Sequence, residues 1–132
     1  MRLALPLWES KISPVLDSAT RLLLVEVEDN GELSRSEIHL DEMDMPMKCR
    51  KIQDLGVDVL ICGAVTRQLS DRLKASGINI VPGISGRLDD VLHACFHGNL
   101  ARSEYLMPGW SLDGLEELLR GLNLQGARRP GI

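Results

Sequence analysis

The side chains best able to do chemistry in this chain carry sulfur. A run of soft ligands occupies every second position, at Met43, Met45, Met47 and Cys49. Thioether and thiolate sulfur bind Cu(I) or sulfur-bridged clusters in preference to hard ions. In an extended loop alternate side chains share one side, so this acidic loop, residues 41–47, would let the methionines converge. The pattern favours the alternative, in which one or two methionines fill the core and Cys49 lies on the buried face of a helix.

A second thiol, Cys62, ends the apolar run 57–62, which is typical of a central parallel strand. Ligands of open α/β sheets bind outside the carboxyl ends of the strands. Turns, helix N-termini and arginines at that edge would offer donors to an anionic cluster or a phosphate. The predicted anion-binding residues are Cys62, Gly63, Ala64, Arg67, Ser85, Gly86 and Arg87, and the predicted metal ligands are Cys62, Cys49 and Met45. Ordinary turns around a buried cysteine are an equal alternative.

A third thiol lies in the segment His93-Ala94-Cys95-Phe96-His97, which has the residue types of a metal motif. On a helix, at about 100° per residue, Cys95 points into the apolar stripe while both histidines lie on the opposite face. The three side chains therefore cannot share one ion. We expect solvated histidines and a core cysteine.

Composition limits the class of protein. The 132 residues are 44% hydrophobic and 26% charged, which is typical of one globular domain with a real core. A net charge of −4 and 3% aromatic residues argue against a general nucleic-acid binder. The 3 cysteines form no C-x-x-C pair, so we expect reduced thiols. No apolar run approaches the ~20 residues of a membrane helix, and we expect a cytoplasmic protein.

Hydrophobic periodicity predicts a mixed α/β domain. Strands are expected at residues 3–7, 21–28, 33–40, 57–62 and 78–81, with Pro6 stopping the first and Asn30-Gly31 forming a hairpin. Helices are expected from about Pro46 to residue 55, over residues 66–76 and over residues 86–97. This order predicts a five-stranded mixed sheet with strand order 3-2-1-4-5 and helices on its faces.

Three segments in this order resemble a known family: SPVLDSA after the first strand, GVDVLICGAV at the fourth and PGISG before the third helix. They are similar to the nitrogenase iron-molybdenum cofactor biosynthesis family of small cofactor carriers. The resemblance covers residues 1–100. It implies a ribonuclease-H-like fold and a non-catalytic accessory protein that binds or delivers an iron-sulfur or iron-molybdenum type cluster.

The chain departs from the family pattern at three positions. Val15 stands where the family has a histidine, and Asp17 and Ala64 stand where it has glycines. The usual histidine ligand is therefore absent. The rival interpretation is a divergent protein-interaction module that has lost the cluster site. We expect no metal in the isolated protein, because the sequence alone does not bring three ligands together.

A ribonuclease-H-like fold makes nuclease activity the first enzymatic alternative. Two-metal nucleases need carboxylates that converge on Mg²⁺, one of them within the first strand. The first strand here carries no acid, and Asp58 alone cannot hold two metals. We therefore expect no enzymatic activity.

Residues 101–132 are expected to form a C-terminal extension of the domain at residues 1–100. Pro108-Gly109-Trp110 reads as a linker, and Ser111 is a typical cap for a helix over 111–122 with leucines at 112, 115, 118, 119 and 122. So short a helix is marginal alone in water, so its leucines need a surface. We expect this helix to contact its own domain, a second copy or another protein, with no nucleic-acid or membrane partner.

Overall fold

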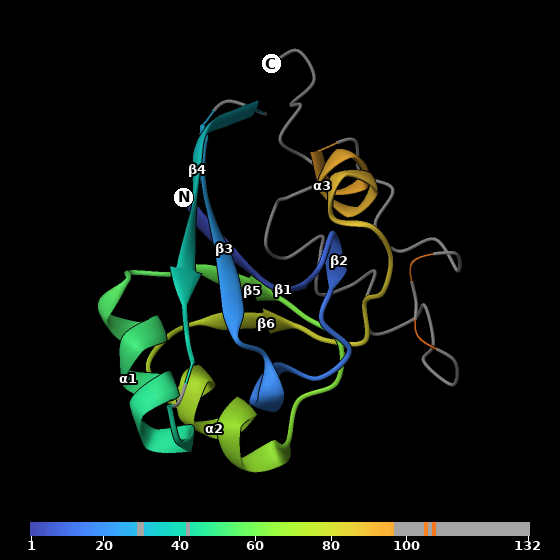
Figure 1. The fold of residues 1–132 in the computed structure, drawn as a ribbon. Helices are drawn as coiled ribbons and strands as arrows, with labels where there is room; N and C mark the ends of the chain where they lie inside the picture. Colours follow the sequence, from blue (N-terminus) through green and yellow to red (C-terminus); the bar gives the residue numbers. More distant parts are fainter. Residues whose placement is uncertain (29–30, 42, 97–104, 106, 108–132) are drawn as a thin grey trace.

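The computed structural model describes residues 1–28, 31–41, 43–96, 105 and 107 (Figure 1). The strands are β1 (Arg2–Trp8), β2 (Lys11–Ile12), β3 (Arg21–Glu28), β4 (Gly31–His39), β5 (Val59–Ile61) and β6 (Asn79–Val81). The α-helices are α1 (Met45–Asp54), α2 (Arg67–Ala75) and α3 (Leu88–Phe96), and a 3-10 turn, η1, spans Leu16–Ser18. Among these residues, no helix has the length and apolar character needed to cross a membrane.

The described strands form one mixed sheet of 6 strands in the order β4-β3-β1-β5-β6, with β2 paired to β1 beside this path. β3 runs antiparallel to both β1 and β4, whereas β5 runs parallel to β1 and β6. The strands expected from the sequence take these places. The expected count of five was wrong because β2 adds a short hairpin to β1, pairing Leu7 with Ile12 and Trp8 with Lys11. A left-handed residue, Glu9 at φ 59°, makes its turn.

Pro6 lies inside β1 and does not end it, contrary to the prediction. β1 pairs with β5 up to Ala4 and with β2 from Leu7 onward, so Pro6 lies between the two ladders. Its carbonyl accepts a hydrogen bond from Ser13 N on that side, at 2.8 Å. The proline therefore sits in a central strand where neither neighbour requires its missing N–H.

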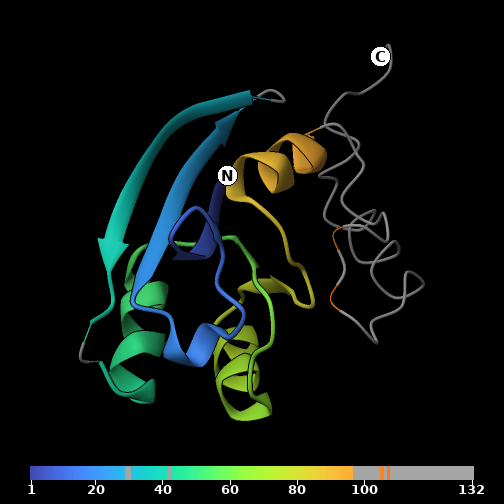
Figure 2. The ribbon, with the colours of Figure 1, turned by 45° about the vertical axis from the view of Figure 1, so that its right-hand side comes forward.

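Two hydrophobic cores lie on opposite faces of the sheet. Leu5 of β1 and Ile61 of β5 face the core under α3, while Ala4 and Leu60 face the core under α1 and α2. Figure 2 shows α3 on the side of the sheet opposite the two other helices. Alternate residues of one strand serve both cores, which is why the sequence of β5 is apolar without interruption.

Capping side chains begin α1 and α2, and glycines follow their ends. The side chains of Asp44 and Thr66 accept hydrogen bonds from backbone N–H groups in the first turns of α1 and α2. Gly56 and Gly77 follow these helices at φ 70° and 91°. Because α1 begins at Met45, the predicted loop over 41–47 is shorter than expected.

Some expectations fall on residues that the structure does not describe. Of the predicted Asn30-Gly31 turn, Asn30 lies outside the described residues, and Gly31 was wrongly placed in the turn, since it begins β4 and pairs with Glu28. The end of the third helix at His97 and the predicted helix over 111–122 with Trp110 also lie outside the described residues. The boundary near residue 100 stays a prediction.

The burial of β5 on both faces predicts two matched losses of stability. Leu60 and Ile61 are 0% exposed and face opposite cores. Leu60→Ala and Ile61→Ala should each lower the free energy of unfolding by about 2–5 kcal/mol, since each leaves a cavity. Urea unfolding measures both, with Ser36→Ala on exposed β4 as the control. A loss below about 1 kcal/mol for either core variant would show that one face of β5 is not covered.

Candidate functional site

Three loops meet at the carboxyl ends of β5 and β6. Ala64 N donates to Pro14 O at 2.8 Å, and Leu16 N donates to Ala64 O at 2.9 Å. On the other side, Gly83 N donates to Gly63 O at 3.0 Å. The loop after β5 is thus held between the loop after β2 and the loop after β6. This is the sheet edge at which the sequence predicts a ligand site.

Gly63 allows these loops to approach closely. A Cβ atom at this position would lie 2.6 Å from Pro14 O and 2.9 Å from Ser13 O, both backbone atoms. No side chain fits there unless the backbone moves. Gly63 therefore has a packing role that the sequence alone did not reveal.

Two of the predicted anion donors already have protein partners. Ala64 N is bound to Pro14 O as above, and Ser85 N donates to Tyr105 O at 2.8 Å. Gly86 accepts from Ile12 N at 3.0 Å through its carbonyl, so this turn contacts β2. In the described structure the edge is thus closed by backbone hydrogen bonds at these positions.

Two arginines supply exposed positive charge near the edge. Arg67 opens α2 and Arg87 precedes α3, and both are exposed. Arg87 forms an isolated bridge with Lys11 of β2. The two arginines therefore belong to different loop pairs, one beside residues 62–64 and the other beside β2.

Cys62 is held as a neutral thiol. Its side chain is 0% exposed. Burial raises its pKa from 9.0 to about 12, and the charge of Asp17 adds to this effect. Metal ligation and nucleophilic attack both require the thiolate. The thiol can serve either role only if the residues that cover it move.

The other predicted metal ligands lie in the same core as Cys62. Cys49 is 3% exposed on the buried face of α1, where it accepts a hydrogen bond from Gln53 Nε2 at 3.2 Å. Met45 is half-buried against this core, whereas Met47 is 53% exposed. Met45 and Met47 do not converge as in an extended loop, since residues two apart on a helix point about 200° apart. The favoured alternative is confirmed: Cys49 lies on the buried face of a helix, and Met43 and Met45 pack against the core.

The remaining thiol, Cys95, lies in the core under α3, and burial raises its pKa to about 12. His93 is exposed on the same helix. Within the described ranges, no group of three or more His, Cys, Asp and Glu side chains is arranged to hold a metal ion.

Sequence reasoning missed the residues that fasten the loop over this edge. The carboxylate of Asp17 accepts from Thr66 N at 3.0 Å and from Thr66 Oγ1 at 2.6 Å. A negative side chain thus already occupies the N-terminus of α2, where it interacts favourably with the helix dipole. The sequence feature that could have pointed to Asp17 is the presence of an aspartate where the family pattern has a glycine.

Lys48 fastens the same loop from α1. It is 4% exposed, and its ammonium group donates to the carbonyls of Asp17 and Ala19, the latter at 3.1 Å. Burial lowers its pKa. The sequence feature that could have predicted its burial is helical spacing, because Lys48 falls between Met45 and Ile52 on the apolar stripe of the helix.

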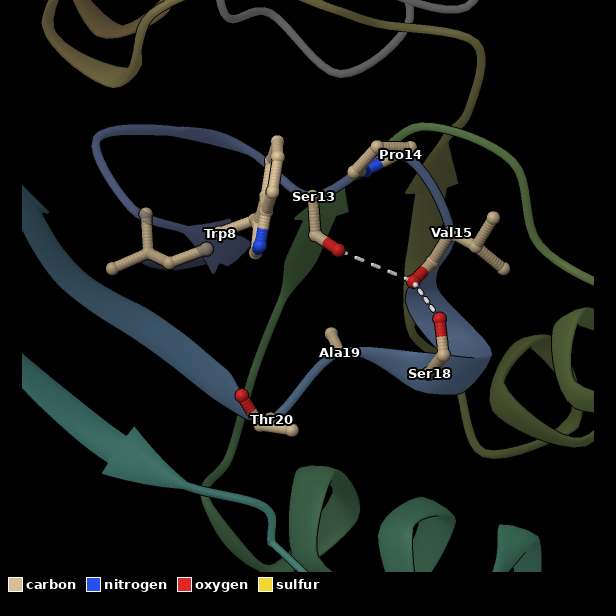
Figure 3. Close-up of a pocket in the computed structure, with 8 residues that line it drawn as sticks. Trp8, Ser13, Pro14, Val15, Ser18, Ala19 and Thr20 are labelled. Carbon is tan, nitrogen blue, oxygen red and sulfur yellow. Dashed lines mark hydrogen bonds between the residues drawn. The ribbon is translucent and has the colours of Figure 1, made fainter.

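A pocket of about 430 Å³ lies on the outer side of this loop. Figure 3 shows Trp8 and Pro14 beside it, while the side chain of Val15 points away from it and Ser13 and Ser18 both donate to the carbonyl of Val15. The full lining consists of Leu7, Trp8, Ser13, Pro14, Val15, Ser18, Ala19 and Thr20. Sequence reasoning did not find this pocket, since its walls come from the end of β1 and from the separate loop over residues 13–20.

The buried thiols predict a loss of stability at alkaline pH. Cys62 and Cys95 ionise near pH 9 when unfolded and near pH 12 when folded. Their contribution is complete below pH 9 and is lost as pH rises toward 12, because only the unfolded chain releases these protons. Each thiol contributes a slope of up to about 1.4 kcal/mol per pH unit.

Denaturant unfolding between pH 7 and 11 measures this slope. Cys62→Ala and Cys95→Ala should each make it shallower, and the double variant should make it shallower still. An unchanged slope in the double variant would mean that neither thiol is buried as described.

Comparisons with known proteins identify the family and the fold. The chain matches the profile of the dinitrogenase iron-molybdenum cofactor family over residues 1–98. No curated protein matches it. The crystal structure of the protein PH0822 superposes with a TM-score of 0.72 at 21% identity, covering 76% of this chain and 92% of that chain.

Two further solved structures share the fold. One is a provisionally assigned dinitrogenase of Methanocaldococcus jannaschii, with a TM-score of 0.65 and 22% identity. The match covers 76% of this chain and 91% of that chain. The other is the apo form of the orange protein of Desulfovibrio gigas, with a TM-score of 0.62 and 16% identity. The match covers 75% of this chain and 89% of that chain. The structures show the shared fold, and the profile match over residues 1–98 shows that this chain belongs to the dinitrogenase iron-molybdenum cofactor family.

Proposed function

We propose that this protein is a non-catalytic accessory protein that binds or delivers an iron-sulfur or iron-molybdenum type cluster on a ribonuclease-H-like scaffold. The observation that carries the proposal is the meeting of three loops over a thiol, Cys62, at one sheet edge in a member of this family. The exposed arginines Arg67 and Arg87 are the charged groups suited to an anionic cargo there.

Binding through Cys62 requires the loop over residues 13–18 to open. Opening breaks the hydrogen bonds of Ala64 N with Pro14 O, of Leu16 N with Ala64 O and of Thr66 with the Asp17 carboxylate. At about 0.5–1.5 kcal/mol for each bond, the cost is a few kcal/mol. Cluster binding must exceed this cost, so loading is conditional, and we expect the isolated protein to carry no cluster.

A second candidate function is supported by the same loop. Val15 stands where the family has its histidine, and its side chain is 38% exposed. Asp17 places a fixed negative charge at the α2 N-terminus, where an anionic cargo would be repelled. These two residues favour a protein-interaction module that has lost the cluster site.

Cluster reconstitution separates the two candidates. The protein is purified without oxygen, incubated with iron, sulfide and molybdate, and desalted; visible absorbance and metal content are then measured. For a carrier, the wild type should retain a chromophore that Cys62→Ser abolishes. Asp17→Gly should load more cluster than wild type, because it releases the loop and removes a negative charge.

Cys95→Ser is the matched control, since it removes an equally buried thiol from the opposite core. It should load like the wild type. Equal loading of Cys62→Ser would contradict the assigned ligand. A colourless protein in both the wild type and Asp17→Gly would reject the carrier function and favour the interaction module.

A further inference from the structure

We propose that the pocket beside Trp8 is a docking site for this chain's own C-terminal segment, residues 111–122. The docked segment would place its leucines against Trp8 and Pro14. The argument for docking does not rest on the proposed cluster binding, although both involve the loop over residues 13–18.

The surface has the properties of a docking site. Of the large hydrophobic side chains that the structure describes as exposed, two lie here, Trp8 at 55% and Val15 at 38%. Trp8 borders the 430 Å³ pocket together with Pro14, whereas Val15 turns its carbonyl toward the pocket and its side chain away (Figure 3). Leu7 and Ala19 are also in the lining. An exposed tryptophan at the rim of an apolar pocket is typical of the residues that dominate binding energy.

The described end of the chain lies at the same edge of the sheet. Met107 N donates to Gly83 O at 2.8 Å, Gly83 N donates to Gly63 O at 3.0 Å, and Gly63 packs on Pro14. Neighbouring strands are about 4.8 Å apart, so these three steps span about 14 Å. The five residues from Met107 to Leu112 reach about 17 Å when extended. The segment can therefore reach the pocket without disturbing the domain.

The chemistry of the segment suits this pocket. Its leucines at 112, 115, 118, 119 and 122 would share one side of the helix predicted from the sequence, and Glu116, Glu117 and Arg120 are among its charged residues. A helix of this length needs a surface to be stable in water. A short linker gives the chain's own segment an effective concentration in the millimolar range. The same chain is thus favoured over a second copy as the occupant.

Trp8 provides a direct reporter of docking. The chain has 2 tryptophans, so a Trp110→Phe variant of the full chain leaves Trp8 alone. In this background, acrylamide quenching of Trp8 is compared with and without the double substitution Leu115→Asp and Leu119→Asp. Glu116→Gln with Glu117→Gln is the matched control. Light scattering gives the molecular mass of each sample, and circular dichroism checks the fold.

The proposal predicts a monomer in which Trp8 is protected, with quenching increased at least twofold by the leucine substitutions and unchanged in the control. Quenching that is already maximal before substitution, or unaffected by it, would overturn the proposal. Protection only in a dimer would assign the pocket to a second copy and would also overturn it.

Discussion

The close contact of Gly63 with the backbone of Ser13 and Pro14 is the constraint on which the ligand edge of this protein depends. The backbone oxygens lie 2.6–2.9 Å from the place of a Cβ atom. Only glycine lets the loop after β5 approach the loop after β2 this closely. The hydrogen bonds from Ala64 N to Pro14 O and from Gly83 N to Gly63 O follow from that approach. Together they close the carboxyl edge of the sheet.

Closure of this edge determines the state of the thiol beneath it. Cys62 has no exposed surface, and burial raises its pKa to about 12. Asp17 and Lys48 hold the covering loop from two helices, through the α2 N-terminus and through backbone carbonyls. The same loop presents Val15 and Pro14 outward. One short segment thus separates a buried thiol on its inner side from an apolar pocket on its outer side.

Much of the fold could be predicted from the sequence, because its signals are local. The uninterrupted apolar run around β5, the caps at Asp44 and Thr66 and the glycine ends of two helices each act within a few residues. β2 was missed because its two residues carry no periodic pattern. Pro6 was misread because its place between two ladders depends on strands that are distant in the sequence.

The site was less predictable, because its contacts join distant segments. The sequence indicated which edge would bring Cys62, Gly63 and Ala64 together with a helix N-terminus. It did not show that Asp17, 49 residues before Thr66, supplies the anion at that terminus. Nor did it show that an ordinary turn carbonyl, Pro14 O, occupies the donor of Ala64. The assignment of ligand residues stays a prediction.

The most direct test of this account is Gly63→Ala, with Gly31→Ala as control. An added Cβ at Gly31 meets its nearest atom at 3.9 Å, so that substitution fits without strain. Gly63→Ala should lower the free energy of unfolding by about 1–3 kcal/mol. It should also accelerate iodoacetamide labelling of Cys62, located by mass spectrometry, while Cys95 and the control are unchanged. Equal stability and equal Cys62 labelling in Gly63→Ala and wild type would contradict the claim that this contact closes the edge.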